Sequence, residues 1–437
     1  MIANLQKVWA TGHIRQKIIF TLLMIAVYKL LSAIPVPWIN VGLLSAFSEQ
    51  LRANTQLAFF GSIMGGWLEQ FSIILMGLAP YINATIIIQL LAVIIPSLES
   101  LKKEGEQWQK KLNNYTRYLT VPLALAQSYG MILLLNTIVG TGGAAPIIDT
   151  TNFWGVVFPA MAFITAGTMI LLWLGDLITE WGIGNGTSII IFAGVLAWVP
   201  QHILNYVSTE NYALLAVITA LTVGVIYVIV RFTEWYRKVP LIYTRTGRDE
   251  RSYFPIRVNQ AGMVPIIFAI AIITFPSLIG QILSKRWSGT GATVGEWLAA
   301  NLSMQNPSWF YIGAYFLLVL GFSFFYVSIT FNTTDVAENI QKRGWYIPWV
   351  RPGKETATYL QHVSDRLNLW GWWFLALIAV FPYLMTRVST YAGFSFSSGN
   401  IDFLISGSGL IIVVGVILDI IRRIDTDMKS FDYKKFH

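Results

Sequence analysis

Ten long apolar segments recur along this chain, and they constrain its fold more than any other feature of the sequence. A helix needs about 20 mostly apolar residues to cross the hydrocarbon core of a bilayer. Each segment is too long and too poor in charge for a surface helix of a soluble protein. They cover residues 18–38, 72–95, 118–138, 153–175, 187–204, 211–231, 258–283, 309–331, 368–386 and 402–421.

The composition agrees with a polytopic membrane protein that is helical throughout. Of the 437 residues, 55% are hydrophobic and 12% are charged, whereas soluble domains carry about 25% charged residues. The absence of cysteine excludes disulfides, cysteine-ligated zinc and thiol catalysis. We expect no cleavable signal peptide, because the first apolar segment contains Lys29 and lacks a small-residue cleavage site.

The basic residues predict the orientation in the membrane. If all ten segments span and the N-terminus is cytoplasmic, 25 of the 30 Lys and Arg residues lie on the cytoplasmic side. Four lie on the far side, and Lys29 is inside the first span. This bias predicts that both termini are cytoplasmic. The net charge of +8 also suggests contact with anionic lipid headgroups.

The stretch from Met76 to Pro96 carries no charge but is more than a lipid anchor. Gly77 and Pro80 predict an early interruption of its helix. Polar side chains at membrane depth need partners in protein or water, and this stretch contains Asn83, Thr85 and Gln89. The stretch is either a core helix of a bundle or a broken helix that lines a path through the membrane.

Three connecting loops carry further signals. Alternating apolar residues around TRTGRD in the basic loop 232–257 suggest a protruding hairpin, and IPWVRPGKETATYL in the loop 332–367 predicts a turn around Arg351. Both loops serve either to retain topology by charge or to dock a partner. In the third, DLITEWGIGNGTSIII, three glycines predict a tight turn that leads into an apolar helix. That loop lacks the lysine of a phosphate-binding loop, which argues against nucleotide binding.

Two classes of membrane protein fit this sequence poorly. A coupled secondary transporter usually needs ionisable groups inside the membrane, and the second to ninth segments hold none in their interiors. A membrane-embedded enzyme is disfavoured because no Ser-His-Asp, HExxH or paired-carboxylate pattern falls within the segments. No cofactor or metal is expected.

Several stretches together resemble the SecY/Sec61-alpha family of protein-translocase channel subunits. They are GLAPYINATIIIQLL (77–91), PSLESLKKEGEQWQKKLNNYTRYLT (96–120), WLGDLITEWGIGNGTSIIIFAG (173–194), VNQAGMVPIIFA (258–269) and IPWVRPGKETATYL (347–360). These stretches are dispersed over most of the chain and occur in the family's order. The external loops 284–308 and 387–402 contribute little to the resemblance.

The resemblance implies ten spans in two inverted five-span halves, residues 1–205 and 206–437, around an hourglass pore. It implies a pore ring of Leu78, Ile82, Thr187, Ile191, Ile267 and Ile412, although the family often has an aliphatic residue in place of Thr187. It places a plug within 60–70, including Phe60, Gly61, Ser62, Ile63, Met64, Gly65, Gly66 and Trp67. From the residues alone, the region 39–71 reads instead as an external loop with an amphipathic surface helix.

The resemblance also implies a lateral gate between the second and third spans on one side and the seventh and eighth on the other. Its positions are Asn83, Gln89 and Phe275. Partner docking falls on Arg245, Arg248 and Arg351. Branched aliphatics suit a pore ring because they bind no passing group strongly and close by dewetting. Polar residues at the gate hold it shut by about 1 kcal/mol each.

The implied activity is translocation of unfolded secretory polypeptides and lateral release of transmembrane segments, without enzymatic activity. The implied partners are SecE and SecG small membrane subunits, the SecA ATPase, the ribosome, signal sequences, unfolded preproteins and anionic lipids. The implied location is the bacterial plasma (inner) membrane.

Overall fold

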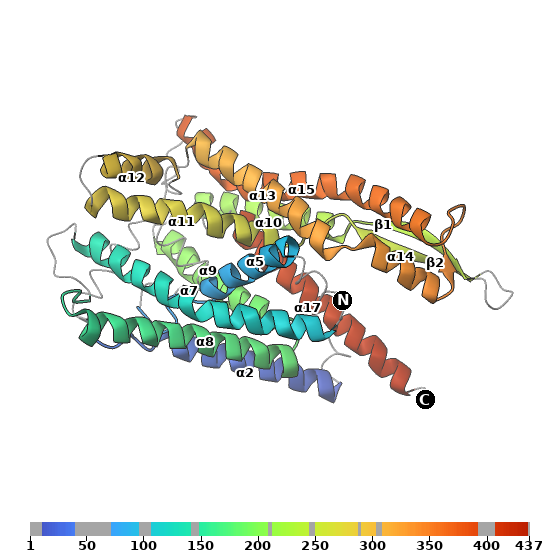
Figure 1. Ribbon diagram of the computed structural model, residues 1–437, viewed down its shortest axis with the longest axis horizontal. Coiled ribbons are helices and arrows are strands. Elements are labelled where there is room, and N and C mark those ends of the chain that lie inside the picture. Colours follow the sequence, from blue (N-terminus) through green and yellow to red (C-terminus); the bar gives the residue numbers. More distant parts are fainter. Residues whose placement is uncertain are drawn as a thin grey trace.

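The computed structural model describes residues 11–39, 71–95, 106–140, 148–208, 212–243, 250–286, 290–302, 308–391 and 407–435. These residues form a bundle of long helices with one small sheet at one end (Figure 1). The predicted plug residues 60–67, and Arg245 and Arg248, lie outside the described residues.

Each predicted apolar segment overlaps a helix among the described residues. In chain order these are α2 (Gly12–Ser32), α5 (Ala79–Ile94), α7 (Glu106–Gly140), α8 (Phe158–Trp181) preceded by the π-helical turn η2 (Phe153–Val157), α9 (Gly186–Ser208), α10 (Tyr212–Glu234), α11 (Val264–Arg286), α13 (Trp309–Thr330), α15 (Lys354–Tyr391) and α17 (Gly407–Lys435). Two shorter helices, α12 (Thr290–Asn301) and α14 (Thr333–Lys342), lie between them.

The start of α5 differs from the predicted interruption within a helix. Residues 71–78 form turns, Gly77 has a φ of 52°, and the helix begins only at Ala79. Pro80 therefore lies in the first helical turn, where its missing N–H has no intrahelical partner to lose. The result is a helix of 16 residues that starts part-way along the bundle.

Two hydrophobic cores divide most of the helices between them. One core contains side chains of α2, α5, α7, α8 and α9, and the other contains side chains of α10, α11, α13 and α15. Helix α17 contributes to both, through Ile412 and Val416 in the first and Val414 and Leu418 in the second. The division of the chain at residue 205 and the inverted relation of the two halves both stay predictions.

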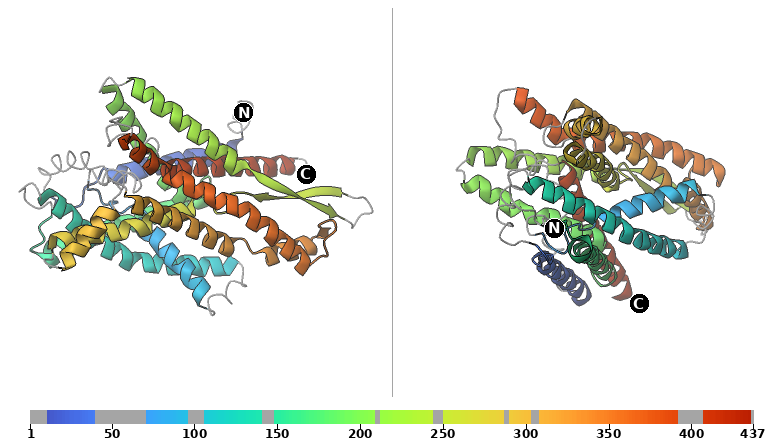
Figure 2. Two further views of the ribbon diagram at one scale, coloured as in Figure 1. Left: turned by 90° about the horizontal axis from the view of Figure 1, so that it is seen from above. Right: turned by 60° about the vertical axis from the view of Figure 1, so that its left-hand side comes forward.

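The predicted hairpin is confirmed. Strands β1 (Tyr236–Tyr243) and β2 (Glu250–Arg257) pair antiparallel, and β3 (Trp345–Tyr346) adds to the other side of β1. The strands project from the bundle next to α14 and the first turns of α15 (Figure 2). These elements share a third core that includes Val239, Ile340, Ile347 and Leu360. We call β1, β2, β3, α14 and residues 347–367 the loop module.

The outer faces of the helices are apolar and exposed, as in a membrane protein. Leu22 of α2, Leu317 of α13 and Val223 of α10 are examples. Exposed tryptophans, Trp154 and Trp181, flank α8 at its two ends. They are separated by about 40 Å at 1.5 Å per helical residue, which matches the distance between the two headgroup regions of a bilayer, where tryptophan is enriched.

By length and composition, the described residues contain three helical stretches that are suited to cross a membrane. They are Phe153–Trp181, Trp309–Lys342 and Lys354–Met385. Three shorter apolar helices, Ala79–Ala92, Gly186–Ala197 and Val264–Ile273, accompany them.

Candidate functional site

Five branched aliphatic residues that the resemblance assigns to a pore ring belong to one large hydrophobic core, and we call these five residues the waist. Leu78 and Ile412 are buried members of the first core, and Ile82, Ile191 and Ile267 pack against that core. They come from the start of α5 and from α9, α11 and α17. Helices from both parts of the chain therefore contribute apolar side chains to one core, and the convergence of these residues on a pore axis stays a prediction.

The turn before α5 positions Leu78 and Ile82. The backbone N–H of Ile82 donates to the carbonyl of Leu78 at 3.0 Å, so the two side chains lie one helical turn apart. The turn itself is held by the segment that follows α2, because the N–H of Ile73 donates to the carbonyl of Ile34 at 3.0 Å. Leu78 is thus fixed by backbone contacts that lie far from it in the sequence.

The glycine-rich turn before α9 positions Ile191, as its sequence predicted. Gly184 has a φ of 84°, which a side chain rarely tolerates. The side-chain oxygen of Asn185 accepts from the backbone N–H of Thr187 at 3.1 Å and caps the helix. Gly186 lies so close to α8 that a Cβ there would come 1.9 Å from the carbonyl oxygen of Gly175.

Thr187 has a place in this turn that the sequence did not reveal. It is half-buried, and a Cβ on Gly175 would come 3.3 Å from its methyl group. Thr187 therefore packs at the contact between α8 and α9, one helical turn before Ile191. Its membership of the pore ring stays a prediction.

A seam between the two groups of helices runs where the lateral gate is predicted. Helix α11 contacts both α5 and α7. Asn83 and Gln89 are half-buried on α5, and Phe275 lies on α11 next to Pro276, with its side chain outside the described part. The structure thus places all three on helices that border this seam, and their gating role stays a prediction.

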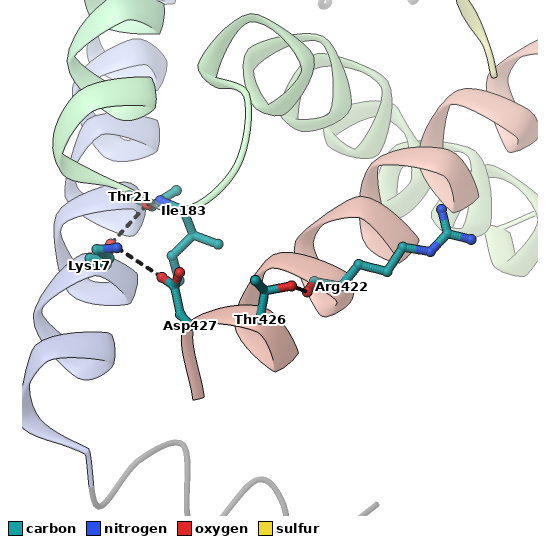
Figure 3. Close-up of polar contacts among 6 residues, drawn as sticks. All are labelled: Lys17, Thr21, Ile183, Arg422, Thr426 and Asp427. Atoms are coloured by element: carbon teal, nitrogen blue, oxygen red, sulfur yellow. Dashed lines mark hydrogen bonds and ion pairs between the residues drawn. The ribbon is translucent and has the colours of Figure 1, made fainter. Parts of the chain in front are cut away.

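A set of polar contacts joins the first and last helices of the bundle, and we call it the clasp (Figure 3). The Nζ of Lys17 on α2 lies 2.9 Å from the Oδ2 of Asp427 on α17. The hydroxyl of Thr21 donates to the carbonyl of Lys17 and accepts from the N–H of Ile183 in the α8–α9 turn. Earlier in α17, Arg422 donates a hydrogen bond of 3.5 Å to the carbonyl of Thr233, near the end of α10.

The same end of the bundle carries most of the basic segments. Through the clasp, the start of α2 and the end of α17 lie together next to the root of the hairpin. Arg117, near the start of α7, forms an ion pair of 2.6 Å with Asp176 near the end of α8. Burial and the nearby Arg257 lower the pKa of Arg422 from its ordinary value. This end of the molecule is therefore strongly positive.

Among the described residues, no group of three or more His, Asp or Glu side chains is arranged to hold a metal ion. Of the predicted docking residues, Arg351 is described, and it is exposed in the loop between β3 and α15. The waist can exclude water and ions, the seam can part, and the loop module can present arginine side chains to a partner.

This architecture matches solved channels over nearly its whole length. A structure of a protein-conducting channel aligns with a TM-score of 0.66 and 15% identity, and covers 95% of this chain and 93% of that one. Sec61 in a canine ribosome-channel complex from the endoplasmic reticulum aligns with a TM-score of 0.64 and 15% identity, over 95% and 93%. The fold is that of a protein-conducting channel.

The sequence comparisons define the family. The family model described as SecY matches residues 72–421. The protein translocase subunit SecY of Corynebacterium glutamicum is 37% identical over 97% of both chains. That of Escherichia coli strain K12 is 34% identical over 97% of this chain and 94% of its own. The chain belongs to the SecY family, and the resemblance noted in its sequence is confirmed.

Proposed function

We propose that this chain forms a passive channel for unfolded polypeptides, with ten spans in two inverted halves around an hourglass pore. The common membership of Leu78, Ile82, Ile191, Ile267 and Ile412 in one hydrophobic core supports this proposal. A polypeptide channel must pass every kind of side chain and still block ions. Branched aliphatics meet both demands, since they close by dewetting and do not trap charged segments. Charged or arginine rings would retain segments of opposite sign.

The energy for transport comes from a partner, and the chain itself is no enzyme. A motor such as the SecA ATPase, or a translating ribosome, pushes the polypeptide, and small subunits such as SecE and SecG complete the channel. A solved neighbour of this fold is a ribosome-channel complex. The basic end of the molecule, with the loop module and Arg351, is the docking surface, and anionic headgroups contact its basic residues.

Signal sequences and transmembrane segments leave sideways through the seam between α5, α7 and α11. Asn83 and Gln89 hold this seam closed by about 1 kcal/mol each, a latch weak enough for a hydrophobic signal helix to displace. The plug within 60–70, which the resemblance implies, lies outside the described residues and stays a prediction. A coupled transporter is not favoured, since the family relatives are protein translocase subunits.

Glycine substitution of the waist tests this function. Ile82, Ile191, Ile267 and Ile412 are replaced together by glycine, and ion conductance of the resting channel is measured in planar bilayers. We expect a persistent leak, because the dewetted constriction widens and fills with water. Conductance equal to that of the wild type would contradict the waist as the seal.

The matched control uses the same four helices. Ile87, Leu196, Ile272 and Ile417 are exposed on the outer faces of α5, α9, α11 and α17. Their replacement by glycine removes a similar amount of apolar side chain and introduces the same number of flexible positions. A leak in this control as large as in the waist variant would show that helix loosening, and not the waist, causes the conductance.

A further inference from the structure

Trp349 in the loop module is fully exposed, with 103% of its reference surface accessible. Its backbone is also unusual, with a φ of 66°. A bulky residue seldom adopts a positive φ, because its Cβ crowds the following carbonyl. An exposed tryptophan held in a conformation that suits glycine has no role in the packing of the loop module.

The loop holds this side chain outward by fixed contacts on both sides. Ile347 is buried in the core of the loop module, and Val350 packs against the same core. The N–H of Val350 donates to the carbonyl of Ile347 at 3.2 Å and closes a turn around Trp349. The turn is already formed before binding. A partner that binds Trp349 therefore incurs little more than the entropic cost of immobilising one side chain.

The position of Trp349 separates it from the bilayer. Helix α15 begins at Lys354, whereas its predicted span begins at residue 368, so about 20 Å of helix precede the span. The loop module projects beyond the ends of the other helices (Figures 1 and 2). A tryptophan at this distance does not belong to the interfacial aromatic belt that Trp181 fits.

The charges around Trp349 indicate the partner's chemistry. Arg343, Arg351 and Lys354 are exposed in the same loop region, together with one carboxylate, Glu355. Lys342 is paired with Glu338 at 3.1 Å. Such a mixed but positive rim around one large aromatic resembles the centre of a protein interface, where tryptophan and arginine supply most of the binding energy. An RNA surface favours a basic patch that acidic groups do not interrupt.

We propose that Trp349 is the anchor by which the loop module docks a cytosolic protein partner. The partner offers an apolar pocket that accepts the indole, and carboxylates on the rim of this pocket face Arg351 and Lys354. This inference rests on the proposed docking function of the loop module and adds to it the residue that supplies affinity. The arginines then set orientation and association rate, and Trp349 sets the lifetime of the complex.

Binding of the purified SecA ATPase to the full-length channel in nanodiscs tests the proposal. The variant Trp349→Gly removes the side chain and leaves a residue that favours the positive φ, so the loop keeps its shape. We expect it to bind SecA about tenfold or more weakly. Trp154→Ala is the matched control, because Trp154 is also exposed but lies in η2, before the start of α8, and is not part of the loop module. We expect its affinity to equal that of the wild type.

Two further measurements separate failure of the Trp349 anchor from failure of the proposed docking function. Hydroxyl-radical footprinting of the wild-type complex should show Trp349 protected by SecA, and Arg351→Glu should weaken SecA binding. If Arg351→Glu weakens binding and Trp349→Gly does not, the anchor is overturned and the docking function stands. If neither variant changes the affinity, both are overturned.

The same variants distinguish a protein partner of Trp349 from two alternatives, ribosomal RNA and a second copy of this chain. Loss of affinity for purified ribosomes with unchanged SecA binding, and a steep dependence on salt, would assign Trp349 to RNA and overturn the protein pocket. Weaker association between channel copies, with unchanged SecA binding, would assign it to a second copy of this chain and would also overturn the proposal.

Discussion

At the scale of single residues, the waist depends on glycines that let backbones approach. Gly167 is buried in α8, and a Cβ there would come 1.9 Å from the carbonyl oxygen of Ile73. Ile73 belongs to the turn that leads to Leu78, so this close contact positions the start of α5. A helix-internal glycine costs about 1 kcal/mol relative to alanine, but any side chain at position 167 would collide with the backbone of Ile73.

We therefore expect Gly167→Ala to destabilise the protein by about 1–3 kcal/mol, since the extra carbon displaces backbone and not a flexible side chain. The measurement is the midpoint of thermal unfolding in detergent. Gly224 in α10 is the matched control, because nothing lies within 4 Å of a Cβ at that position. Gly224→Ala should leave the midpoint unchanged or raise it. Equal midpoints for the two alanine variants would contradict the close contact of α8 with Ile73.

At the scale of elements, the clasp joins α2 to α17 through Lys17 and Asp427, which are 410 residues apart in the sequence. Both side chains of its ion pair are partly exposed, so the pair contributes at most about 1 kcal/mol. Its effect is local: it holds the last turns of α17 against α2. We expect Asp427→Asn to speed hydrogen exchange in residues 422–435 and to leave the global stability nearly unchanged.

The double variant Lys17→Asp with Asp427→Lys reverses the pair, and it should restore slow exchange. High salt should act on the wild type like Asp427→Asn, because it screens exposed charges. Glu338→Gln is the control, since it breaks an ion pair of similar length within α14. If Glu338→Gln speeds exchange in 422–435 as much as Asp427→Asn does, the clasp is not the cause.

The sequence predicted the helices well because the bilayer dictates their length and composition. It predicted the hairpin from alternation around TRTGRD, and the tight turn before α9 from its glycines, whereas the cap that Asn185 forms was not predicted. It did not predict the clasp, because Lys17 and Asp427 each look like a solvated charge near a helix end. Nor did it predict that Pro80 starts a helix: the carbonyl of Ile34 holds the preceding turn, and local sequence carries no sign of that contact.

At the scale of the whole molecule, α17 joins the two cores and also forms one side of the waist. Ile412 lies in the first core, whereas its neighbours Ile411 and Val414 lie in the second. A helix that packs into both groups can follow either one when the seam between α5, α7 and α11 parts. The clasp fixes the far end of α17 to α2, so movement of the two groups is expected to be largest away from the clasp.

The orientation of the whole chain can be tested directly because it has no cysteine. Thr150 is exposed just before η2, and Ser252 is exposed on β2. The start of α8, which follows η2, and strand β2 lie at opposite ends of the molecule (Figure 1). If the basic end faces the cytoplasm, an impermeant maleimide labels Thr150→Cys in intact cells and labels Ser252→Cys only after the cells are opened. The reverse pattern would invert the topology, and labelling of both in intact cells would mean that the bundle does not separate two compartments. Either result would also remove the loop module from the reach of a cytosolic motor, so this experiment decides whether docking and sealing belong to one channel.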